Sequence, residues 1–597
     1  MKSKIIDLVS LPVGSVVTLS GWIHRRRNHG DLFFIDLRDY TGIIQCRSDS
    51  NPEILVSLSK LRCESVITVS GKIKSRPDGT ENKKILTGSI EIDIENLIIL
   101  NSSEVLPFEV NGDDVFRVSE EIRLEYRFLD LRRAEMAKNL KLRSSVISYL
   151  RRSMEALDFM EIQTPILTAS SPEGARDYLV PARLHPGKFY ALPQAPQIFK
   201  QTLMSSGIER YFQIAPCFRD EASRSDRLPG EFYQLDYEMA FATQADVFKV
   251  GEDVLYPLFT KFAEKPVSQT PWIQIPYDTS IEKYGNDKPD LRYTLEMQDV
   301  TALFKTIECP PFMQEILDKG GVIKTITVPH GERLTPKFGK ELDSFAKDLG
   351  MPGIGFMRIG DIGTLNPGPL AKFFTDDAKQ KITNITLSSQ TAASSTQVIF
   401  FIAGMREEVK KYGSSMRVEI SKKLGYFEDS FNFCWITDFP MYELDETGKI
   451  EFSHNPFSMP QGGQDLGMAV FDQDPLSLKA YQYDLVCNGT ELSSGAVRNH
   501  RVDMLIKAFS LAGYSEDVVR DKFRSLIKAF SYGCPPHAGM APGAERICLL
   551  LLNSTNIRDV VAFPLNGAAE CKFTGAPNIP TDKQIKELNL KPIKKDK

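Results

Sequence analysis

The stretch YFQIAPCFRDEASRSDRLPGEFYQLDYEMAF, residues Tyr211–Phe241, decides the fold of this chain. The apolar segment Tyr211–Phe218 predicts a strand, Arg219–Gly230 a charged loop, and Glu231–Phe241 a returning strand. Alternation along the returning strand places four side chains on one face: Phe232, Gln234, Asp236 and Glu238. A face that carries Gln, Asp and Glu together is costly to bury unless it lines a polar pocket.

The loop of this hairpin is open to two interpretations. It could be a solvated hairpin tip that carries surface ion pairs. It could also be a nucleotide clamp, in which guanidinium groups hold phosphates while carboxylates hold Mg²⁺ or the adenine amine. Its charged side chains alternate in sign: Arg219, Asp220, Glu221, Arg224, Asp226 and Arg227.

The whole hairpin resembles motif 2 of the class II aminoacyl-tRNA synthetases, and the form FRDE…DR…EF.Q.D.E is that of their aspartyl branch. The resemblance favours the nucleotide clamp. It implies a multidomain α+β protein with an antiparallel-sheet catalytic domain, and the family's other motifs follow in order over about residues 10 to 580.

Length and composition set broad limits. At 597 residues the chain should hold several domains. With 42% hydrophobic residues and a net charge of −5, no global basic field points to nucleic acid, so any RNA contact must come from local patches. The nine cysteines are scattered without CxxC pairs, which favours free thiols in a reducing cytoplasm over a zinc site. The apolar runs are too short for a membrane span, and the N-terminus does not read as a targeting segment.

Residues 1–105 predict a five-stranded barrel with a helix between its third and fourth strands, the pattern of an OB-fold. The helix is expected at Pro52–Leu61, with Asn51 as N-cap. The strands are expected at Val16–His24, Leu32–Arg38, Ile43–Arg47, Ser65–Ile73 and Ile90–Leu100.

The segment GWIHRRRNHGDLFFIDLRD places Arg25, Arg26 and Arg27 beside Phe33 and Phe34, of which one must point inward by alternation. This pattern suits single-stranded nucleic acid, and it equally suits a basic edge strand that resists aggregation. The segment resembles the anticodon-binding domain of bacterial aspartyl-tRNA synthetases. That resemblance implies that Phe34 stacks on an anticodon base while three residues read bases: Arg25, Arg27 and Gln45.

Residues 106–134 predict a hinge, and Glu135–Leu157 predicts a long helix with one apolar stripe. The helix and the following FMEIQTPILT resemble motif 1, which implies a homodimer. We expect the catalytic domain to occupy residues 135–285 and 416–565, followed by a C-terminal extension at 566–597. Residues 286–415, after the signature YGNDKPDLR (Tyr284–Arg292), are expected to form an inserted α+β domain that resembles the GAD domain of bacterial aspartyl enzymes.

The resemblance also implies an aspartate site and a metal site. SHNPFSMP carries His454, although many relatives have a second histidine where this chain has Asn455. Asp484 ends a predicted strand and Glu491 lies just past an Asn-Gly turn, so both could hold Mg²⁺ on an ATP triphosphate. The residues implied to contact aspartate are Glu173, Gln197, Lys200, Arg219, His454 and Arg498.

GMAPGAERICLLLL resembles motif 3, GxAxGxxR, in which Arg546 would reach the γ-phosphate and Gly543 would let the backbone approach adenine. Relatives often have an aliphatic-Asp pair where this chain has Ala544-Glu545. The implied ATP contacts are Arg219, Asp220, Glu221, Leu228, Phe232, Glu491, Gly543, Ala544, Glu545 and Arg546.

The implied reaction is the formation of aspartyl-adenylate from L-aspartate and ATP, then transfer to tRNA, with Arg219, Arg546 and Glu491 catalytic. His29 is of the type we associate with enzymes that charge tRNA-Asp and tRNA-Asn alike. Four alternatives are an enzyme restricted to tRNA-Asp, an asparaginyl-tRNA synthetase, an amide synthetase on the same fold, and a non-catalytic RNA-binding relative. Intact Arg219, Glu221, Glu491 and Arg546 disfavour the last.

Overall fold

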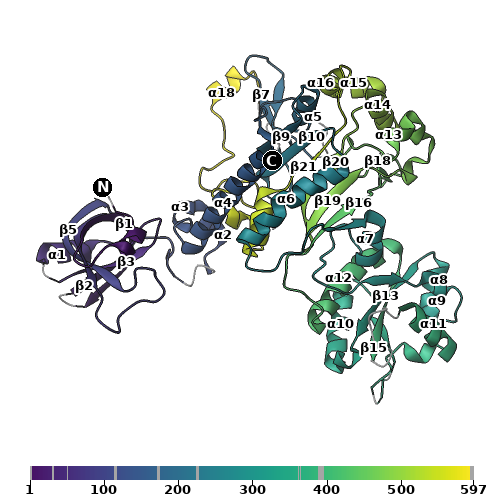
Figure 1. Ribbon diagram of the computed structural model, residues 1–597, viewed down its shortest axis with the longest axis horizontal. Coiled ribbons are helices and arrows are strands. Elements are labelled where there is room, and N and C mark those ends of the chain that lie inside the picture. The colour runs from purple at the N-terminus through teal and green to yellow at the C-terminus, as the bar shows by residue number, and fades with distance from the viewer. Residues whose placement is uncertain are drawn as a thin grey trace. The chain divides into compact units, whose positions relative to one another are not determined.

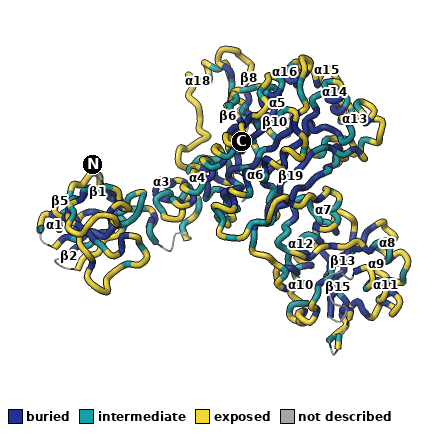
Figure 2. Tube along the Cα trace, in the orientation of Figure 1, coloured by how far each residue is buried: buried dark blue, intermediate teal, exposed yellow. Residues whose placement is uncertain are grey.

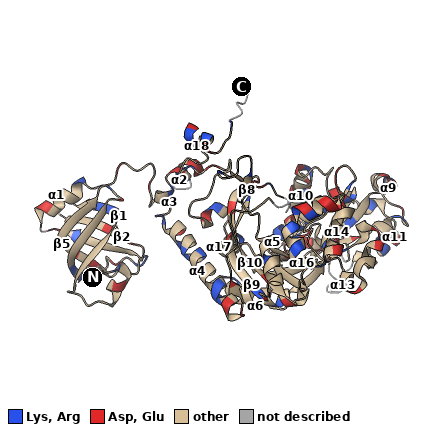
Figure 3. Ribbon diagram, turned by 90° about the horizontal axis from the view of Figure 1, so that it is seen from above, with Lys and Arg blue, Asp and Glu red and all other residues tan. Residues whose placement is uncertain are grey.

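The computed structural model describes residues 3–29, 32–49, 51–112, 117–170, 175–223, 228–360, 362–363, 365–386 and 396–591 (Figure 1). The chain divides into two compact units, Met1–Ala134 and Glu135–Lys597, and each is described by itself. Within the described residues, no helix combines the length and apolarity that crossing a bilayer requires. Acidic and basic side chains are interspersed on outer helices such as α10 (Pro336–Asp348) (Figure 3).

The first unit is built on a closed five-stranded barrel of strand order β1-β2-β3-β5-β4, as the sequence predicts for an OB-fold. In β2 and the first part of β1, buried residues alternate with more accessible ones, so that one face of these strands fills the barrel (Figure 2). The Asn51 side chain caps α1 by accepting from Glu53 N and Ile54 N. The elements are β1 (Val16–His29), β2 (Leu32–Arg38), β3 (Ile43–Ser48), α1 (Pro52–Lys60), β4 (Val66–Ser75), β5 (Ile90–Asn101), α2 (Glu120–Glu125) and α3 (Arg127–Asp130).

One boundary in the barrel differs from the sequence prediction. The sequence predicts that strand β1 ends at His24, yet it continues to His29, which pairs with Leu32. After a register shift between Ile23 and Arg25, residues 25–29 continue to pair with β2. His29 is therefore a strand residue.

The second unit contains an eight-stranded sheet of order β11-β16-β19-β20-β21-β10-β9-β6, antiparallel except at its two outermost pairs. The decisive stretch of sequence supplies the hairpin of β9 and β10, as predicted. The strands are β6 (Met160–Glu161), β9 (Arg210–Arg219), β10 (Gly230–Ala240), β11 (Ile273–Pro276), β16 (Phe433–Thr437), β19 (Gln482–Cys487), β20 (Thr490–Val497) and β21 (His537–Met540).

Helices pack on this sheet and cover its apolar face. Phe248 of α6 stacks on Trp435 of β16 with ring centroids 4.0 Å apart, at the centre of the largest core. The main helices are α4 (Ala134–Ala156), α5 (Gln197–Ser205), α6 (Gln244–Phe262), α7 (Tyr277–Tyr284), α14 (Val502–Leu511), α15 (Glu516–Lys522), α16 (Arg524–Phe530) and α17 (Ala544–Leu552). Shorter elements are β7 (Leu179–Pro181), β8 (Phe189–Ala191), β17 (Tyr442–Leu444), β18 (Ile450–Phe452), α13 (Gly463–Leu466) and α18 (Asp582–Glu587).

Between β11 and β16 the chain forms a second sheet of order β12-β13-β15-β14, with helices on both faces (Figure 1). This is the α+β class expected for the insertion, but the expected boundary at residue 415 falls inside α12, which runs on to Leu424 and packs in the same core as the sheet, so α12 belongs to the inserted domain. The elements are β12 (Met297–Asp299), α8 (Thr301–Phe304), α9 (Pro311–Asp318), β13 (Val322–Pro329), α10 (Pro336–Asp348), β14 (Gly355–Ile359), α11 (Asp376–Thr386), β15 (Gln397–Gly404) and α12 (Arg406–Leu424).

Candidate active site

A cavity of about 460 Å³ lies against the large sheet, where polar residues of β10, β19 and β20 meet α5 and α17. The polar face predicted for the hairpin contributes Phe232, Gln234 and Asp236 to its wall. Most of the sequence-predicted site residues converge here: Gln197, Lys200, Arg219, Glu221, Leu228, Phe232, His454, Asp484, Glu491, Arg498, Gly543, Glu545 and Arg546.

Arg219 is the last residue of β9, opposite Gly230 at the end of β10. Its guanidinium lies over the ring of Phe232, 5.0 Å from the centroid, which fixes the side chain by a cation–π contact. Among the described residues, its Nε is buried and has no hydrogen-bond partner. Since a buried donor without a partner is costly, this atom is suited to an anionic ligand in the cavity.

Lys200, Asp236 and Arg498 line the cavity, and the buried Glu238 pairs with both of these cations. Lys200 Nζ donates to Asp236 Oδ2 at 2.8 Å and lies 3.5 Å from Glu238 Oε2. Arg498 donates to both oxygens of Glu238, from Nε at 2.8 Å and from Nη2 at 3.2 Å. Burial would raise the pKa of Glu238, but Arg498 and Lys200 outweigh it and the net pKa is lowered. Burial dominates at Asp236, whose pKa is raised.

This group of charges leaves donors directed at the cavity. Within the described part of the chain, Arg498 Nη1 and Gln197 Nε2 are buried without a hydrogen-bond partner. Both residues line the cavity beside Lys200. A carboxylate placed here would satisfy them with charge-assisted hydrogen bonds, whereas a neutral amide would leave part of the cationic face badly paired.

A second carboxylate group lies across the cavity. Asp484 of β19 is fully buried, and a bulge between Leu485 and Val486 brings Glu491 of β20 close to it. Burial raises the pKa of Asp484 well above its ordinary value, and the charge of Glu491 raises it further. Within the described residues Asp484 Oδ1 has no hydrogen-bond partner. Carboxylate oxygens of this kind are the ligands that Mg²⁺ prefers, so the residues fit a magnesium ion.

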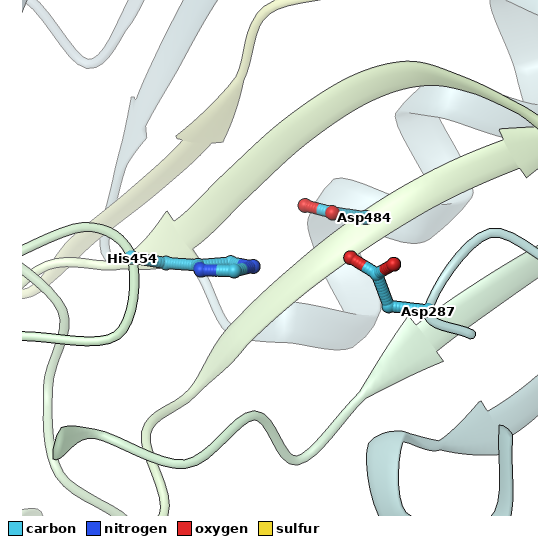
Figure 4. A group of neighbouring side chains, drawn as sticks. All are labelled: Asp287, His454 and Asp484. Carbon is cyan, nitrogen blue, oxygen red and sulfur yellow. The ribbon is translucent and has the colours of Figure 1, made fainter. Parts of the chain in front are cut away.

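Two further side chains face Asp484 from loops. One ligand atom each of Asp287, His454 and Asp484 lies within 4.8 Å of the others, and their side chains point toward one another (Figure 4). Lys288, the next residue, places its Nζ 3.0 Å from Asp287 Oδ2 and 3.3 Å from Glu491 Oε2. The sequence signature YGNDKPDLR contains Asp287 and Lys288, but it predicts no role for either residue.

The start of α17 completes the site. Arg546 Nη1 donates to the Glu491 carbonyl at 2.6 Å, which joins the helix to β20. Glu545 accepts from Tyr233 N at 3.0 Å and from Arg143 Nη2 at 2.7 Å, so it ties α17 to β10 and to α4. Glu545 therefore holds the architecture of the site in addition to lining the cavity.

Two predicted residues do not line the cavity, and a third is not described. Asp220 is exposed and is not among the residues that line the cavity, and its amide donates to the Arg176 carbonyl at 3.0 Å. Ala544 is fully buried behind the cavity wall. Glu173 lies outside the described residues.

Three of the four predicted RNA-reading residues, Arg27, Phe34 and Gln45, form one network on β1, β2 and β3. Arg27 Nη2 donates to Gln45 Oε1 at 2.9 Å and to Asp36 Oδ1 at 3.2 Å, and its guanidinium lies 5.8 Å from the Phe34 ring centroid. His29 meets the same ring edge-on at 6.1 Å. Phe33 is buried and Phe34 half-buried, which confirms the predicted alternation. Arg25, the remaining member, donates to the Asn111 carbonyl at 3.4 Å.

Comparisons with known proteins agree with this organisation. A family model described as "tRNA synthetases class II (D, K and N)" matches residues 119–567, and one described as "OB-fold nucleic acid binding domain" matches residues 17–100. The chain is 50% identical to an aspartate–tRNA(Asp/Asn) ligase of Rickettsia bellii (strain OSU 85-389) and 51% identical to that of Rickettsia prowazekii (strain Madrid E). Each match covers 97% of this chain and 95% of the relative.

Solved structures share the fold at lower identity. An asparaginyl-tRNA synthetase from Pyrococcus horikoshii, complexed with asparaginyl-adenylate, superposes with a TM-score of 0.57 at 18% identity, covering 94% of this chain and 98% of its own. An aspartyl-tRNA synthetase from Entamoeba histolytica gives a TM-score of 0.56 at 19% identity, with 94% and 91% covered.

Proposed function

This chain belongs to the class II tRNA synthetases of the D, K and N group, and from that premise we propose that it is an aspartate–tRNA ligase serving both tRNA-Asp and tRNA-Asn. It would activate L-aspartate with ATP to aspartyl-adenylate and then pass the aspartyl group to a terminal ribose hydroxyl of the tRNA. The observation that carries the choice of amino acid is the buried pair of cations, Lys200 and Arg498, at one end of the cavity.

Aspartate would bind with its side-chain carboxylate against Lys200 and Arg498, beside Gln197. The buried donors of Arg498 and Gln197 that have no partner among the described residues support this placement. Asparagine would present an NH₂ group to these cations, a mismatch that costs a few kcal/mol in a buried site. His454 and Glu173 are proposed to contact the α-amino group.

ATP would lie along the wall between Arg219 and Arg546. The α-carboxylate of aspartate attacks the α-phosphorus of ATP, the bond to the bridging oxygen breaks, and pyrophosphate leaves. Arg219, held over Phe232, would stabilise the charge that develops on the α-phosphate, and Arg546 would hold the γ-phosphate. Asp484 and Glu491 would hold Mg²⁺, which when bound neutralises charge on the triphosphate.

The tRNA would be read by the barrel. Phe34 presents a ring on which an anticodon base could stack, and Arg25, Arg27 and Gln45 are proposed to contact base edges. His29 touches the Phe34 ring, and is therefore placed to influence which anticodon is accepted. We propose that it permits tRNA-Asn as well as tRNA-Asp.

The experiment that tests this function is aspartate charging of purified tRNA-Asp and tRNA-Asn side by side, with wild type and His29→Leu. We expect wild type to charge both and the variant to lose charging of tRNA-Asn selectively. Charging of tRNA-Asp alone by wild type would leave an aspartate–tRNA ligase of restricted specificity. Charging of neither would favour a non-catalytic relative.

We also propose a cytoplasmic homodimer in which α4 and β6, which match the predicted motif 1, form the contact. Light scattering with size-exclusion chromatography would test the dimer, since a monomer at micromolar concentration contradicts it.

A further inference from the structure

A segment of chain at residues 285–295, which follows α7, links the catalytic cavity to the inserted domain. This segment carries Asp287 and Lys288, whose side chains reach the carboxylates of the cavity. On its other side the segment rests on α12, a helix of the inserted domain.

The contact with α12 is made from buried polar groups. Arg417 is fully buried, and its guanidinium donates to three carbonyls of the segment: from Nη1 to Tyr293 at 2.6 Å and Leu295 at 3.2 Å, and from Nη2 to Asp290 at 3.1 Å. It also lies over the Tyr284 ring, 5.1 Å from the centroid. A buried guanidinium used in this way fixes the path of the backbone.

The beginning of the segment is fixed to the same helix. Asn286 Nδ2 donates to Ser414 Oγ at 2.6 Å, and Asn286 Oδ1 accepts from Lys288 N at 2.9 Å. At Gly285, where φ is +80°, an added Cβ would lie 2.5 Å from the Lys410 carbonyl and 3.0 Å from Ser414 N. The segment therefore packs directly on the backbone of α12.

Between these two anchors, Lys288 is held at the mouth of the cavity. Its ammonium lies between Asp287 and Glu491. It thus supplies positive charge where the proposed function places Mg²⁺ and the triphosphate.

We propose that Lys288 is a further ATP-binding residue, whose ammonium contacts the triphosphate, and that Arg417 of the inserted domain is the positioning residue that holds it there. This inference rests on the proposed aspartate activation. If Glu491 held Mg²⁺ as proposed, Lys288 would keep Asp287 as its carboxylate partner and could pair with a phosphate of ATP. The inserted domain then has a defined role, since it sets the position of one cation of the ATP site.

The test uses the full-length enzyme with Lys288→Met, Arg417→Lys and the double variant. Matched controls are Lys283→Met, an exposed lysine paired with Glu296 near the same segment, and Arg406→Lys, an exposed arginine of α12. Three quantities are measured: aspartate-dependent ATP–pyrophosphate exchange, the Kd of Mg²⁺·ATP by calorimetry without aspartate, and the Tm of the ligand-free enzyme.

We expect Lys288→Met to lower kcat/KM for ATP about 10- to 100-fold and to weaken ATP binding, with an unchanged KM for aspartate. Arg417→Lys should lower kcat/KM for ATP roughly 3- to 10-fold. The double variant should have the same kcat/KM for ATP as Lys288→Met alone, because the arginine acts through the lysine. Both controls should stay within about twofold of wild type.

Two results would overturn the inference while leaving aspartate activation intact. One is a wild type that catalyses exchange while Lys288→Met binds and uses ATP normally. The other is a double variant whose loss is the product of the two single losses, which would mean that Arg417 does not act through Lys288. If wild type itself catalyses no exchange, the proposed function fails instead.

Discussion

Two glycines in the segment Gly539–Arg546 are expected to serve different purposes, one in the packing of the sheet and one in ligand binding. Replacing each by alanine distinguishes a loss of stability from a loss of binding. At Gly539 an added Cβ would collide with the Tyr237 carbonyl and would lie 2.8 Å from the Cδ of Glu238. Gly539 of β21 pairs with Glu238 of β10 in the centre of the sheet, so neither backbone can move away. We expect Gly539→Ala to destabilise the catalytic unit by about 3 kcal/mol.

At Gly543 the protein itself does not require a glycine. Its φ is −72°, and the nearest atoms to an added Cβ belong to the Arg546 side chain at 3.6 Å, an ordinary contact. Alanine lowers the entropy of the unfolded chain but is a poorer N-cap for α17, and these two effects nearly offset. We expect Gly543→Ala to change stability by less than about 1 kcal/mol while raising KM for ATP roughly tenfold, because the methyl group enters the space proposed for adenine.

The assay pairs urea unfolding with pyrophosphate exchange at varied ATP. Tryptophan fluorescence reports the right region, because Trp272 and Trp435 both lie in the catalytic core. Equal stability losses in the two variants would refute the steric reasoning. An unchanged ATP KM in Gly543→Ala would refute the adenine placement, whatever the stability shows.

Three further predictions test other parts of the structure. Lys200→Met leaves the buried carboxylates of Asp236 and Glu238 short of a cation, so aspartate-dependent exchange should fall about 100-fold or more and the preference for aspartate over asparagine should shrink. Burial lowers the pKa of His537 from 6.5 to about 4, so between pH 6.5 and 4 this histidine binds a proton in the unfolded chain but not in the folded protein. Stability should therefore be lost as pH falls from 6.5 to 4, by up to about 3 kcal/mol from this group, and urea titrations of His537→Gln should lack that component. Arg27→Ala, in the barrel, should raise KM for tRNA in charging assays while leaving pyrophosphate exchange unchanged.

Alternation and turn chemistry were enough to predict the barrel. Four of its five strands begin and end within two residues of the predicted bounds, because each buries one face and is closed by polar residues. The exception is the end of β1, where Arg25, Arg26 and Arg27 leave no apolar period to follow. Backbone pairing with β2 extends this strand, and no side-chain pattern reports such pairing.

In the catalytic unit, the motifs located the cavity but could not show how its charges are partnered. Lys200 and Arg498 are far apart in sequence, and each was assigned to a substrate carboxylate. The structure pairs both with Glu238, a residue of the predicted polar face that received no individual role. Folding brings the two cations together at the Glu238 carboxylate. The pairing of strands in the sheet produces this arrangement.

Lys288 and Arg417 show more clearly what could not be predicted from the sequence. Neither lies in an amphipathic pattern that would single it out, and 128 residues separate Asn286 from Ser414, which it contacts. Lys288 reaches Glu491 because α12 holds the backbone of the segment that carries Lys288. The helix makes this contact through backbone carbonyl groups, which every sequence possesses. A contact made to the backbone leaves no trace in the residue type of the segment that accepts it. The proposed role of the inserted domain therefore rests on hydrogen-bond geometry, and the double-variant experiment measures whether Arg417 acts through Lys288.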